Sequence, residues 1–263
     1  MIFRLQGGVR EVLALTPVLR EWKRRKMGAV MVETLVPEVL KGNPYVDEVS
    51  EYFDRDDVDV IDLDPVEWQA SLKHATESYA TAVFGDSFLE TWRMVMEHGV
   101  EDEAEAKKLF PVGEHKLVLG SGFSIPGCAD KLREAGWAVS EIDGKKCGWR
   151  VFRAAVSMAE VYVGTQGDET VVATTTDTPV VSVHFWESPD YFLPFRKGVR
   201  TEYVATPLDV CEESPECMVH NGVFENGITY GVRCTQDPKY ACLAWDMPSK
   251  VLKAVEKAVR RKL

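Results

Sequence analysis

The sequence lacks a long apolar run and an excess of positive charge. No stretch of its 263 residues approaches the roughly 18 to 20 uncharged apolar residues that cross a bilayer, and the opening MIFRLQGG lacks the apolar core of a signal peptide. Lys and Arg number 31 against 42 Asp and Glu, so the net charge of -11 opposes phosphate backbones over most of the surface. The composition therefore predicts a cytoplasmic protein without a transmembrane segment and disfavours one that wraps DNA.

Recognisable metal and redox motifs are also scarce. The six cysteines contain no CxxC pair, and none of the five histidines lies in a metal-spaced pair. In a chain without a secretory signal, reduced thiols are the default. Four cysteines after residue 210 leave a weakly signalled structural zinc site open. We otherwise expect no metal and no cofactor, and the stretch QGGVRE lacks the full G-x-G-x-x-G pattern of a dinucleotide-binding turn.

Short β-branched runs recur between helical stretches, which predicts an α/β protein with parallel sheets. The expected strands are Met1–Leu5, Ala29–Leu35, Val58–Leu63, Lys116–Leu119, Ala138–Ile142, Val161–Val163 and Val180–Val183. A charged stretch, EDEAEAKK, followed by the helix-breaking Phe110-Pro111-Val112-Gly113, marks a domain boundary. We expect an N-terminal domain over residues 1–112 and a C-terminal domain over residues 113–263, which ends in an amphipathic helix from Ser249 to Lys262.

The first helix is expected from about Val12 to Lys26, with apolar residues at helical spacing. Pro17 leaves two arrangements open: Thr16 caps a helix that starts at Pro17, or a longer helix kinks at the proline. The basic run Arg20 to Lys26 is either the solvated face of this helix or a local patch that binds nucleic acid.

Several segments together resemble one known family. These are GGVREVLALTPVL after the first strand, VLKGNPYVDEV, DVDVIDLD, the stretch from Val156 to Phe185, and CLAWDMPSKVLKAVEKAV near the C-terminus. The combination is similar to the ADP-heptose:lipopolysaccharide heptosyltransferase family (glycosyltransferase family 9), in a shortened and diverged form. The resemblance implies two Rossmann-like domains facing a cleft, the GT-B arrangement. It also implies a metal-independent inverting enzyme that moves a sugar from an ADP-heptose-like nucleotide-sugar donor to an acceptor hydroxyl.

The resemblance places the acceptor-binding residues in the glycine-rich turn after the first expected strand. The family uses an aspartate there as the base that deprotonates the acceptor; Glu11 stands at that position and Arg10 stands where the family has glycine. Gly7 and Gly8 follow the first strand and let a ligand approach the backbone. We expect Glu11 to be catalytic and Gly7, Gly8 and Arg10 to bind the acceptor. The alternative for Glu11 is a carboxylate that only stabilises a helix N-terminus.

The donor side falls on the C-terminal domain. The glycine-rich loop with Gly120, Ser121 and Ser124 follows that domain's first strand, where ligands bind in open α/β sheets. Asp143 is near the family's acidic contact to the nucleoside, although a tight turn fits equally, and Lys145 or Lys146 could offset diphosphate charge. The segment that corresponds to the family's phosphate-binding loop supplies the remaining candidates: Thr165, Gln166, Gly167, Asp168, Glu169 and Thr170.

That loop departs from the family's side chains while keeping its spacing. Where the family has aspartate, threonine, glycine and histidine, this sequence has Gln166, Gly167, Asp168 and Val171, respectively. Asp168 and Glu169 could compete with a diphosphate, bind sugar hydroxyls, mark a lost activity, or form an ordinary acidic first helical turn.

Three further alternatives stay open. Asp62 and Asp64, at a strand end, form an Asp-x-Asp pair that either holds a divalent metal or is simply solvated or caps the following helix. The chain could also be a non-catalytic binding protein with the same fold. A phage-type DNA-base glycosyltransferase is the third, so the acceptor is a glycan or, less in keeping with the acidic charge, a modified nucleic acid.

Overall fold

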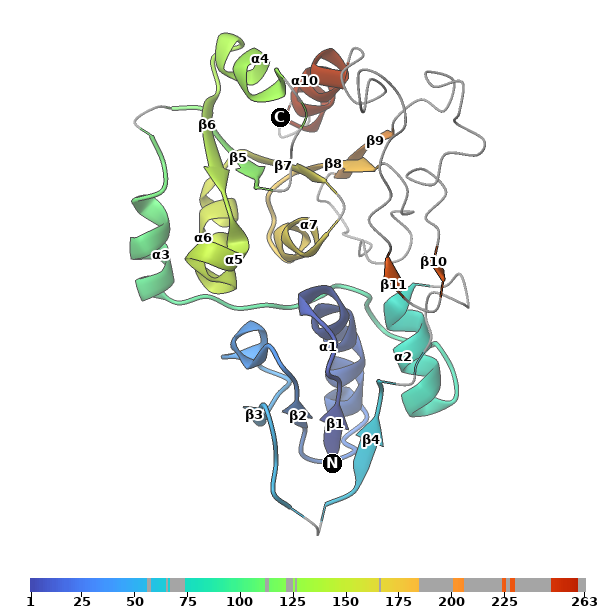
Figure 1. Ribbon diagram of the computed structural model, residues 1–263. Helices are drawn as coiled ribbons and strands as arrows, with labels where there is room; N and C mark the ends of the chain where they lie inside the picture. The colour runs from blue at the N-terminus through green and yellow to red at the C-terminus, as the bar shows by residue number, and fades with distance from the viewer. Residues whose placement is uncertain are drawn as a thin grey trace.

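The chain folds into two α/β units, each built on a parallel sheet (Figure 1). The computed structural model describes residues 1–55, 58–64, 66, 74–111, 114–121, 125, 127–165, 167–184, 201–205, 224–225, 228–229 and 247–259. The sheets have the strand orders β3-β2-β1-β4 and β6-β5-β7-β8-β9, and a short antiparallel pair, β10-β11, stands apart from them. The expected α/β class with two parallel sheets is confirmed.

The first unit alternates strands and helices from the N-terminus. Its strands are β1 (Ile2–Arg4), β2 (Met31–Glu33), β3 (Glu48–Ser50) and β4 (Val60–Asp62), all parallel. Its helices are α1 (Val9–Arg24), the 3-10 turn η1 (Pro37–Leu40) and α2 (Ala75–Phe84). The chain leaves β1 at the centre of the sheet and enters α1 directly, so residues 5 to 8 lie at the carboxyl end of a central strand.

The second unit follows the α3 helix (Val100–Lys107). Its parallel strands are β5 (Lys116–Gly120), β6 (Ala138–Ile142), β7 (Val161–Thr165), β8 (Val180–His184) and β9 (Thr201–Ala205). Its helices are α4 (Cys128–Glu134), α5 (Gly144–Cys147), α6 (Trp149–Met158), α7 (Asp168–Thr174) and α10 (Met247–Val259). The short strands β10 (Phe224–Glu225) and β11 (Ile228–Thr229) pair with each other.

Helices cover both faces of the second sheet. Figure 1 shows α4 and α10 on the side away from the first unit, and α6 and α7 on the side toward it. One hydrophobic cluster lies under α4 and α10, whereas another extends from the first unit's Phe3 and Leu15 to Phe152 and Val172 of the second. The two units therefore share a continuous core through α1, α6 and α7.

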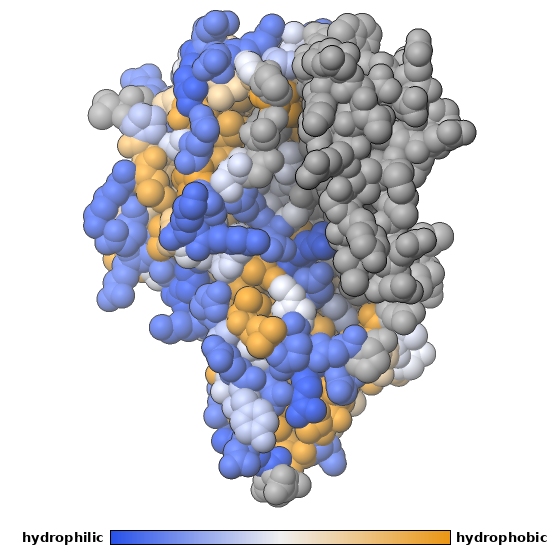
Figure 2. Space-filling view, in the orientation of Figure 1, coloured by the Kyte–Doolittle hydropathy of each residue, from blue (hydrophilic) through white to orange (hydrophobic). Residues whose placement is uncertain are grey.

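A polar surface overlies this junction. Figure 2 shows hydrophilic residues gathered across the middle of the visible face, between the two sheets of Figure 1. The α3 helix, which precedes the expected boundary, packs against α6 of the second unit. Residues 112 and 113 lie outside the described part of the chain, so the exact division of the domains stays a prediction.

The first helix continues through Pro17. A proline at this position has no N–H for the carbonyl of Leu13, four residues earlier. The hydroxyl of Thr16 replaces it by donating to that carbonyl at 2.7 Å, and the same hydroxyl accepts from the backbone N–H of Val95 at 2.9 Å. Of the two arrangements that the sequence left open, the structure has the longer helix, which begins at Val9 rather than at Val12.

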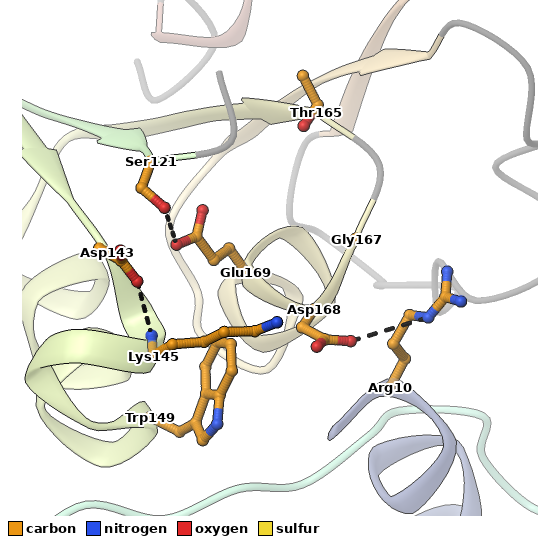
Figure 3. A pocket seen from close by; sticks show the side chains of 9 residues that line it. All are labelled: Arg10, Ser121, Asp143, Lys145, Trp149, Thr165, Gly167, Asp168 and Glu169. Atoms are coloured by element: carbon orange, nitrogen blue, oxygen red, sulfur yellow. Dashed lines mark hydrogen bonds and ion pairs between the residues drawn. The ribbon is translucent and has the colours of Figure 1, made fainter. Parts of the chain in front are cut away.

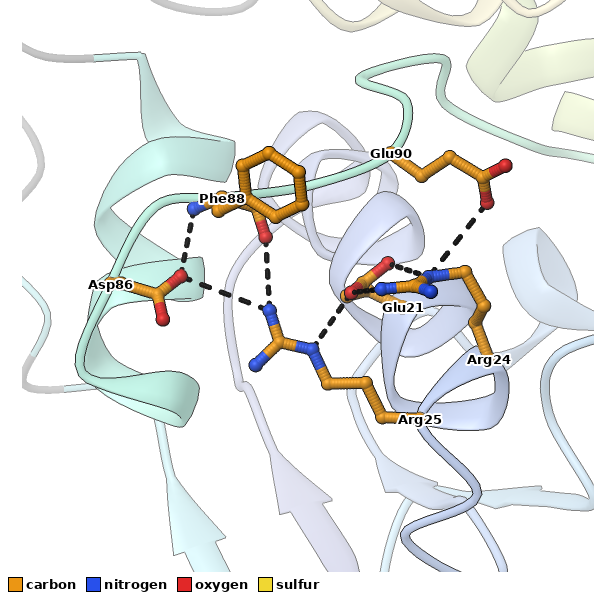
Figure 4. Close-up of polar contacts among 6 residues, drawn as sticks. All are labelled: Glu21, Arg24, Arg25, Asp86, Phe88 and Glu90. Atoms are coloured by element: carbon orange, nitrogen blue, oxygen red, sulfur yellow. Dashed lines mark hydrogen bonds and ion pairs between the residues drawn. The ribbon is translucent and has the colours of Figure 1, made fainter.

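The basic run on α1 is engaged by carboxylates and an aromatic ring. Glu21 is buried and accepts from both Arg24 and Arg25, while Arg25 also donates to the carbonyl of Phe88 at 3.1 Å (Figure 4). Lys23 pairs with Asp47, and Arg20 lies over the Tyr45 ring, 5.6 Å from its centroid. The run thus anchors the end of α1 to neighbouring segments.

The expected strands coincide with observed ones within two or three residues at each end. Sequence reasoning missed the edge strands β3 and β9. Glu48–Ser50 of β3 is partly exposed and lacks an apolar run. A helix, Met247–Val259, stands at the position of the expected C-terminal helix, and residues 260–262 of the expected range lie outside the described residues.

Candidate functional site

A pocket of about 460 Å³ opens where the two units meet (Figure 3). One lining residue, Arg10, comes from the start of α1, and the others come from the second unit. The lining comprises Arg10, Ser121, Asp143, Lys145, Trp149, Thr165, Gly167, Asp168 and Glu169.

The topology of the second sheet explains why these residues meet. Its order corresponds to the doubly wound arrangement in which the second strand lies outside the first and the third lies on the other side. Ligands bind such sheets outside the carboxyl ends of the strands, where connections leave in opposite directions. Ser121, Asp143 and Thr165 stand at or directly after the ends of β5, β6 and β7, so the pocket occupies this switch point.

Glu169 links α7 to the ends of β5 and β6 at the floor of the pocket. Its Oε1 atom accepts from the Ser121 hydroxyl at 2.8 Å and from the backbone N–H of Gly144 at 2.9 Å. Because Ser121 follows β5 and Gly144 follows β6, one carboxylate on α7 ties both strand ends to this helix. Part of the acidic first turn of α7 therefore has a structural role.

Asp143 caps the short α5 helix. Its Oδ1 atom accepts from the backbone N–H groups of Lys145 and Lys146, at 3.0 and 3.2 Å, and its Oδ2 atom lies 3.2 Å from Lys146 Nζ. Desolvation acts to raise the pKa of Asp143, but the hydrogen bonds and charge of Lys146 outweigh it and lower the pKa. The carboxylate therefore stays ionised beside the pocket.

Arg10 connects the pocket to Glu11. Its Nε atom lies 3.6 Å from Glu11 Oε1 and 3.8 Å from Asp168 Oδ1. These distances exceed those of hydrogen bonds and describe electrostatic pairs. All three side chains are partly exposed, at 25% for Arg10, 18% for Glu11 and 27% for Asp168. The expected base and the expected donor loop therefore meet through one guanidinium group.

Two glycines make room for a buried tyrosine below the pocket. A Cβ at Gly120 would lie 2.6 Å from the Tyr162 hydroxyl, and one at Gly164 would lie 2.0 Å from it. Desolvation raises the pKa of Tyr162, whose hydroxyl contacts Thr170 Oγ1 at 3.2 Å. Thr170 in turn donates to the carbonyl of Thr165. Gly120 and Thr170 thus shape the floor without lining the pocket.

The structure gathers most of the expected site residues. Arg10, Ser121, Asp143, Thr165, Gly167, Asp168 and Glu169 line the pocket, whereas Gly7, Gly8 and Glu11 lie at the start of α1. The Glu11 side chain lies against Gly7, where a Cβ would come within 2.7 Å of Glu11 Cβ. Ser124 and Gln166 lie outside the described residues, as do the four cysteines after residue 210.

Sequence reasoning missed Trp149, the aromatic wall of the pocket. Trp149 is buried at the start of α6, and a Cβ at Gly144 would lie 2.5 Å from its ring. The signal for it is weak, because a tryptophan after a glycine in a lysine-rich turn does not by itself indicate a pocket.

The Asp-x-Asp pair is engaged in backbone contacts. Asp64 accepts from the N–H of Gln6 at 2.5 Å, and Asp62 accepts from the N–H of Asp64 at 3.1 Å. Within the described ranges, no group of three or more His, Cys, Asp or Glu side chains is arranged to hold a metal ion. In the same part of the chain, no helix is long and apolar enough to cross a membrane.

Solved structures share this fold at low sequence identity. A glycosyl transferase family 9 protein from Veillonella parvula aligns at a TM-score of 0.69 and 13% identity, covering 98% of this chain and 96% of its own. ADP-heptose LPS heptosyltransferase II of E. coli aligns at 0.64 and 11% identity, covering 99% of both chains. No protein-family model and no curated protein matches the sequence.

A third similar structure contains a donor. It is the dodecameric iron-containing heptosyltransferase TibC, in complex with ADP-D-β-D-heptose, at a TM-score of 0.67 and 11% identity, covering 98% of this chain and 77% of its own. TibC comes from enterotoxigenic E. coli. At these identities the likeness establishes that the chain has the GT-B-type fold of these glycosyltransferases.

Proposed function

We propose that this chain is a glycosyltransferase that binds a nucleotide sugar in the pocket around α7 and transfers the sugar to an acceptor hydroxyl. The observation that carries the proposal is the pocket itself. It lies at the carboxyl ends of β5, β6 and β7, and its wall is completed by the first helix of the other unit. The GT-B-type fold and the donor complex of TibC support a nucleoside diphosphate sugar of the ADP-heptose class.

The proposed reaction is a single displacement with inversion and without a metal. Glu11 takes the proton from the acceptor hydroxyl as the acceptor oxygen attacks the anomeric carbon. The bond from that carbon to the phosphate oxygen breaks, and its electron pair leaves with the nucleoside diphosphate. Glu11 is suited to this task because it lies at the junction of the units, partly exposed and 3.6 Å from a pocket residue. Gly7 and Gly8 lie directly beside the Glu11 side chain, and we assign their backbone to the acceptor.

Ligand binding and turnover test this proposal separately. We expect one class of nucleoside diphosphate to raise the melting temperature, since a ligand at a hundred times its dissociation constant stabilises by about 2.7 kcal/mol. We also expect the matching sugar conjugate, given pooled glycan acceptors, to release the diphosphate. The absence of any thermal shift would leave a non-catalytic protein as the better explanation.

Glu11→Gln distinguishes a base from a carboxylate that only stabilises a helix. The matched control is Glu101→Gln, because Glu101 also lies in the first turn of a helix. Both changes remove a favourable helix-dipole interaction of about 0.3–1 kcal/mol. Only Glu11→Gln should lower turnover, by about 10²- to 10⁴-fold, with diphosphate binding retained. Equal turnover in the two variants would reject Glu11 as the base.

The structure does not favour the DNA-base alternative. The basic run that would have contacted phosphates is engaged by Glu21, Asp47 and Tyr45. Binding to DNA that weakens steeply with salt would revive this alternative.

A further inference from the structure

Arg10 stands out among the pocket residues because it crosses from one unit to the other. It belongs to the first turn of α1, yet it lines a pocket whose other walls come from residues 121–169. Figure 3 shows its side chain rising from α1 beside the start of α7, with its Nε atom paired to Asp168. The contact joins two positions at which the resembling family has glycine. Two departures that are distant in sequence thus form one pair of opposite charges.

The charges of the pocket leave few cations for a phosphate. Asp143 and Glu169 accept hydrogen bonds from backbone N–H groups directly after β6, and Glu169 also accepts from the Ser121 hydroxyl after β5. The lining cations are Arg10 and Lys145, one from each unit, and Lys145 extends past Trp149 toward α7 in Figure 3. A guanidinium group matches phosphate oxygens in geometry and stays charged at all working pH values.

The pairing of Arg10 with Asp168 is loose enough to be exchanged. Its Nε atom is 3.8 Å from Asp168 and 3.6 Å from Glu11, beyond hydrogen-bond distance, and all three side chains are reached by solvent. A diphosphate in the pocket would offer charged oxygens that hydrogen-bond directly to Arg10, whereas Asp168 provides only electrostatic attraction at its present distance.

We propose that Arg10 is the phosphate-binding side chain that the first unit contributes to the donor site. Asp168 holds Arg10 at the pocket in the empty protein, and the donor diphosphate takes the place of Asp168. Arg10 remains protonated throughout. When the bond between the anomeric carbon and the phosphate oxygen breaks, the electron pair stays on the diphosphate and Arg10 neutralises it, while the acceptor proton moves to Glu11. This inference rests on the proposed function and reassigns Arg10 from the acceptor to the leaving group.

The test compares a nucleoside with its diphosphate by titration calorimetry, using the base identified by the thermal screen. We expect Arg10→Gln to weaken diphosphate binding by about ten- to a hundredfold and to leave nucleoside binding unchanged. The matched control is Arg20→Gln on the same helix, whose arginine lies over Tyr45 and outside the pocket. It should change neither affinity by more than about twofold.

Asp168→Asn provides a second measurement that a folding defect cannot imitate. It should strengthen diphosphate binding, because the charge of Asp168 no longer competes with the diphosphate for Arg10. If Asp168 only repelled the ligand, Asp168→Asn would raise diphosphate affinity equally in the wild type and in the Arg10→Gln variant. If the diphosphate takes the place of Asp168 at Arg10, most of this gain in affinity should disappear in the Arg10→Gln variant.

The outcomes separate this inference from the proposed function. A wild-type protein that binds diphosphate but loses no affinity in Arg10→Gln would overturn the role of Arg10 and leave the donor site intact. The role of Arg10 would also be overturned if Arg10→Gln weakened nucleoside binding as much as diphosphate binding. A wild-type protein that binds no nucleotide would overturn both proposals.

Discussion

At the scale of single residues, crowding below the pocket decides which positions tolerate change. Gly120 has no side chain because Tyr162 is fully buried and its hydroxyl occupies the space that a Cβ would need. The Tyr162 ring is packed against Phe152, with 6.0 Å between ring centroids, and therefore has little room to yield. Residues that do not line the pocket thus fix the position of Ser121 and the end of β5.

We expect Gly120→Ala to lower the free energy of unfolding by about 1–3 kcal/mol, the usual cost of overpacking. Tyr162→Phe should recover part of this loss, because it removes the atom that lies 2.6 Å from the added Cβ. The Thr170 hydroxyl keeps its bond to Thr165 in that variant. Urea denaturation of the two single variants and the double variant measures the coupling.

Gly99→Ala is the control for this cycle. A Cβ at Gly99 would meet its nearest neighbour at an ordinary 3.5 Å, so its cost should be smaller and independent of Tyr162. Strict additivity of Gly120→Ala and Tyr162→Phe would show that the hydroxyl is not the obstacle.

At the scale of elements, Thr16 lets α1 contain a proline. Its hydroxyl donates to the Leu13 carbonyl and accepts from Val95, and the side chain is fully buried. We expect Thr16→Val to cost about 1–3 kcal/mol, because it leaves buried polar groups without partners, whereas Thr16→Ser keeps the hydroxyl. Adding Pro17→Ala to Thr16→Val should restore some stability by supplying an N–H to Leu13. Thermal denaturation measures these changes in stability. Equal losses of stability in Thr16→Val and Thr16→Ser would contradict this role of the Thr16 hydroxyl.

Sequence patterns predicted the elements that are buried along their whole length. Runs such as Val161–Val163 and Val180–Val183 are buried at every position, and are apolar apart from Ser182, because helices cover both faces of their sheet. Edge strands such as β3 lack this signature. Pro17 was ambiguous because the groups that compensate for it include Val95, which is far away in the sequence.

The candidate site was predictable where it depends on strand ends and not where it depends on docking. Ser121, Asp143 and Thr165 each follow a strand, and parallel strands bring such positions together. The contact of Arg10 with Asp168 depends on how the two units pack, so no local pattern reveals it. Trp149 escaped prediction for another reason: its role as a pocket wall depends on its packing against Gly144 within the second unit.

At the scale of the whole molecule, an ion cluster around one buried carboxylate contributes to the stability of this acidic chain. Glu21 is 2% exposed, and its side chain receives Arg24 and Arg25 at 2.5 and 2.7 Å. The hydrogen bond from Arg24, helped by that from Arg25 and opposed by desolvation, lowers the pKa of Glu21 from 4.5 to about 2. Through Phe88 and Asp86, Arg25 ties this cluster to the segment after α2.

This lowered pKa predicts how the free energy of unfolding depends on pH. The unfolded chain binds the proton first as pH falls, so the contribution of Glu21 is present above about pH 4.5 and is lost by about pH 2. Because the arginines are partly exposed and solvent screens them, we expect about 2 kcal/mol rather than the full value of the shift. Glu21→Gln should lose this amount at pH 7 and little at pH 2.

Urea denaturation at a series of pH values between 7 and 2 measures the difference between the wild type and Glu21→Gln. Glu105→Gln is the control, because Glu105 pairs with Lys108 on the surface, where both side chains are at least 60% exposed. Such a pair contributes about 0–1 kcal/mol, so its loss should barely change the pH profile. A Glu21→Gln difference that stays constant from pH 7 to pH 2 would mean that packing, rather than the charge of Glu21, holds α1 to its neighbours.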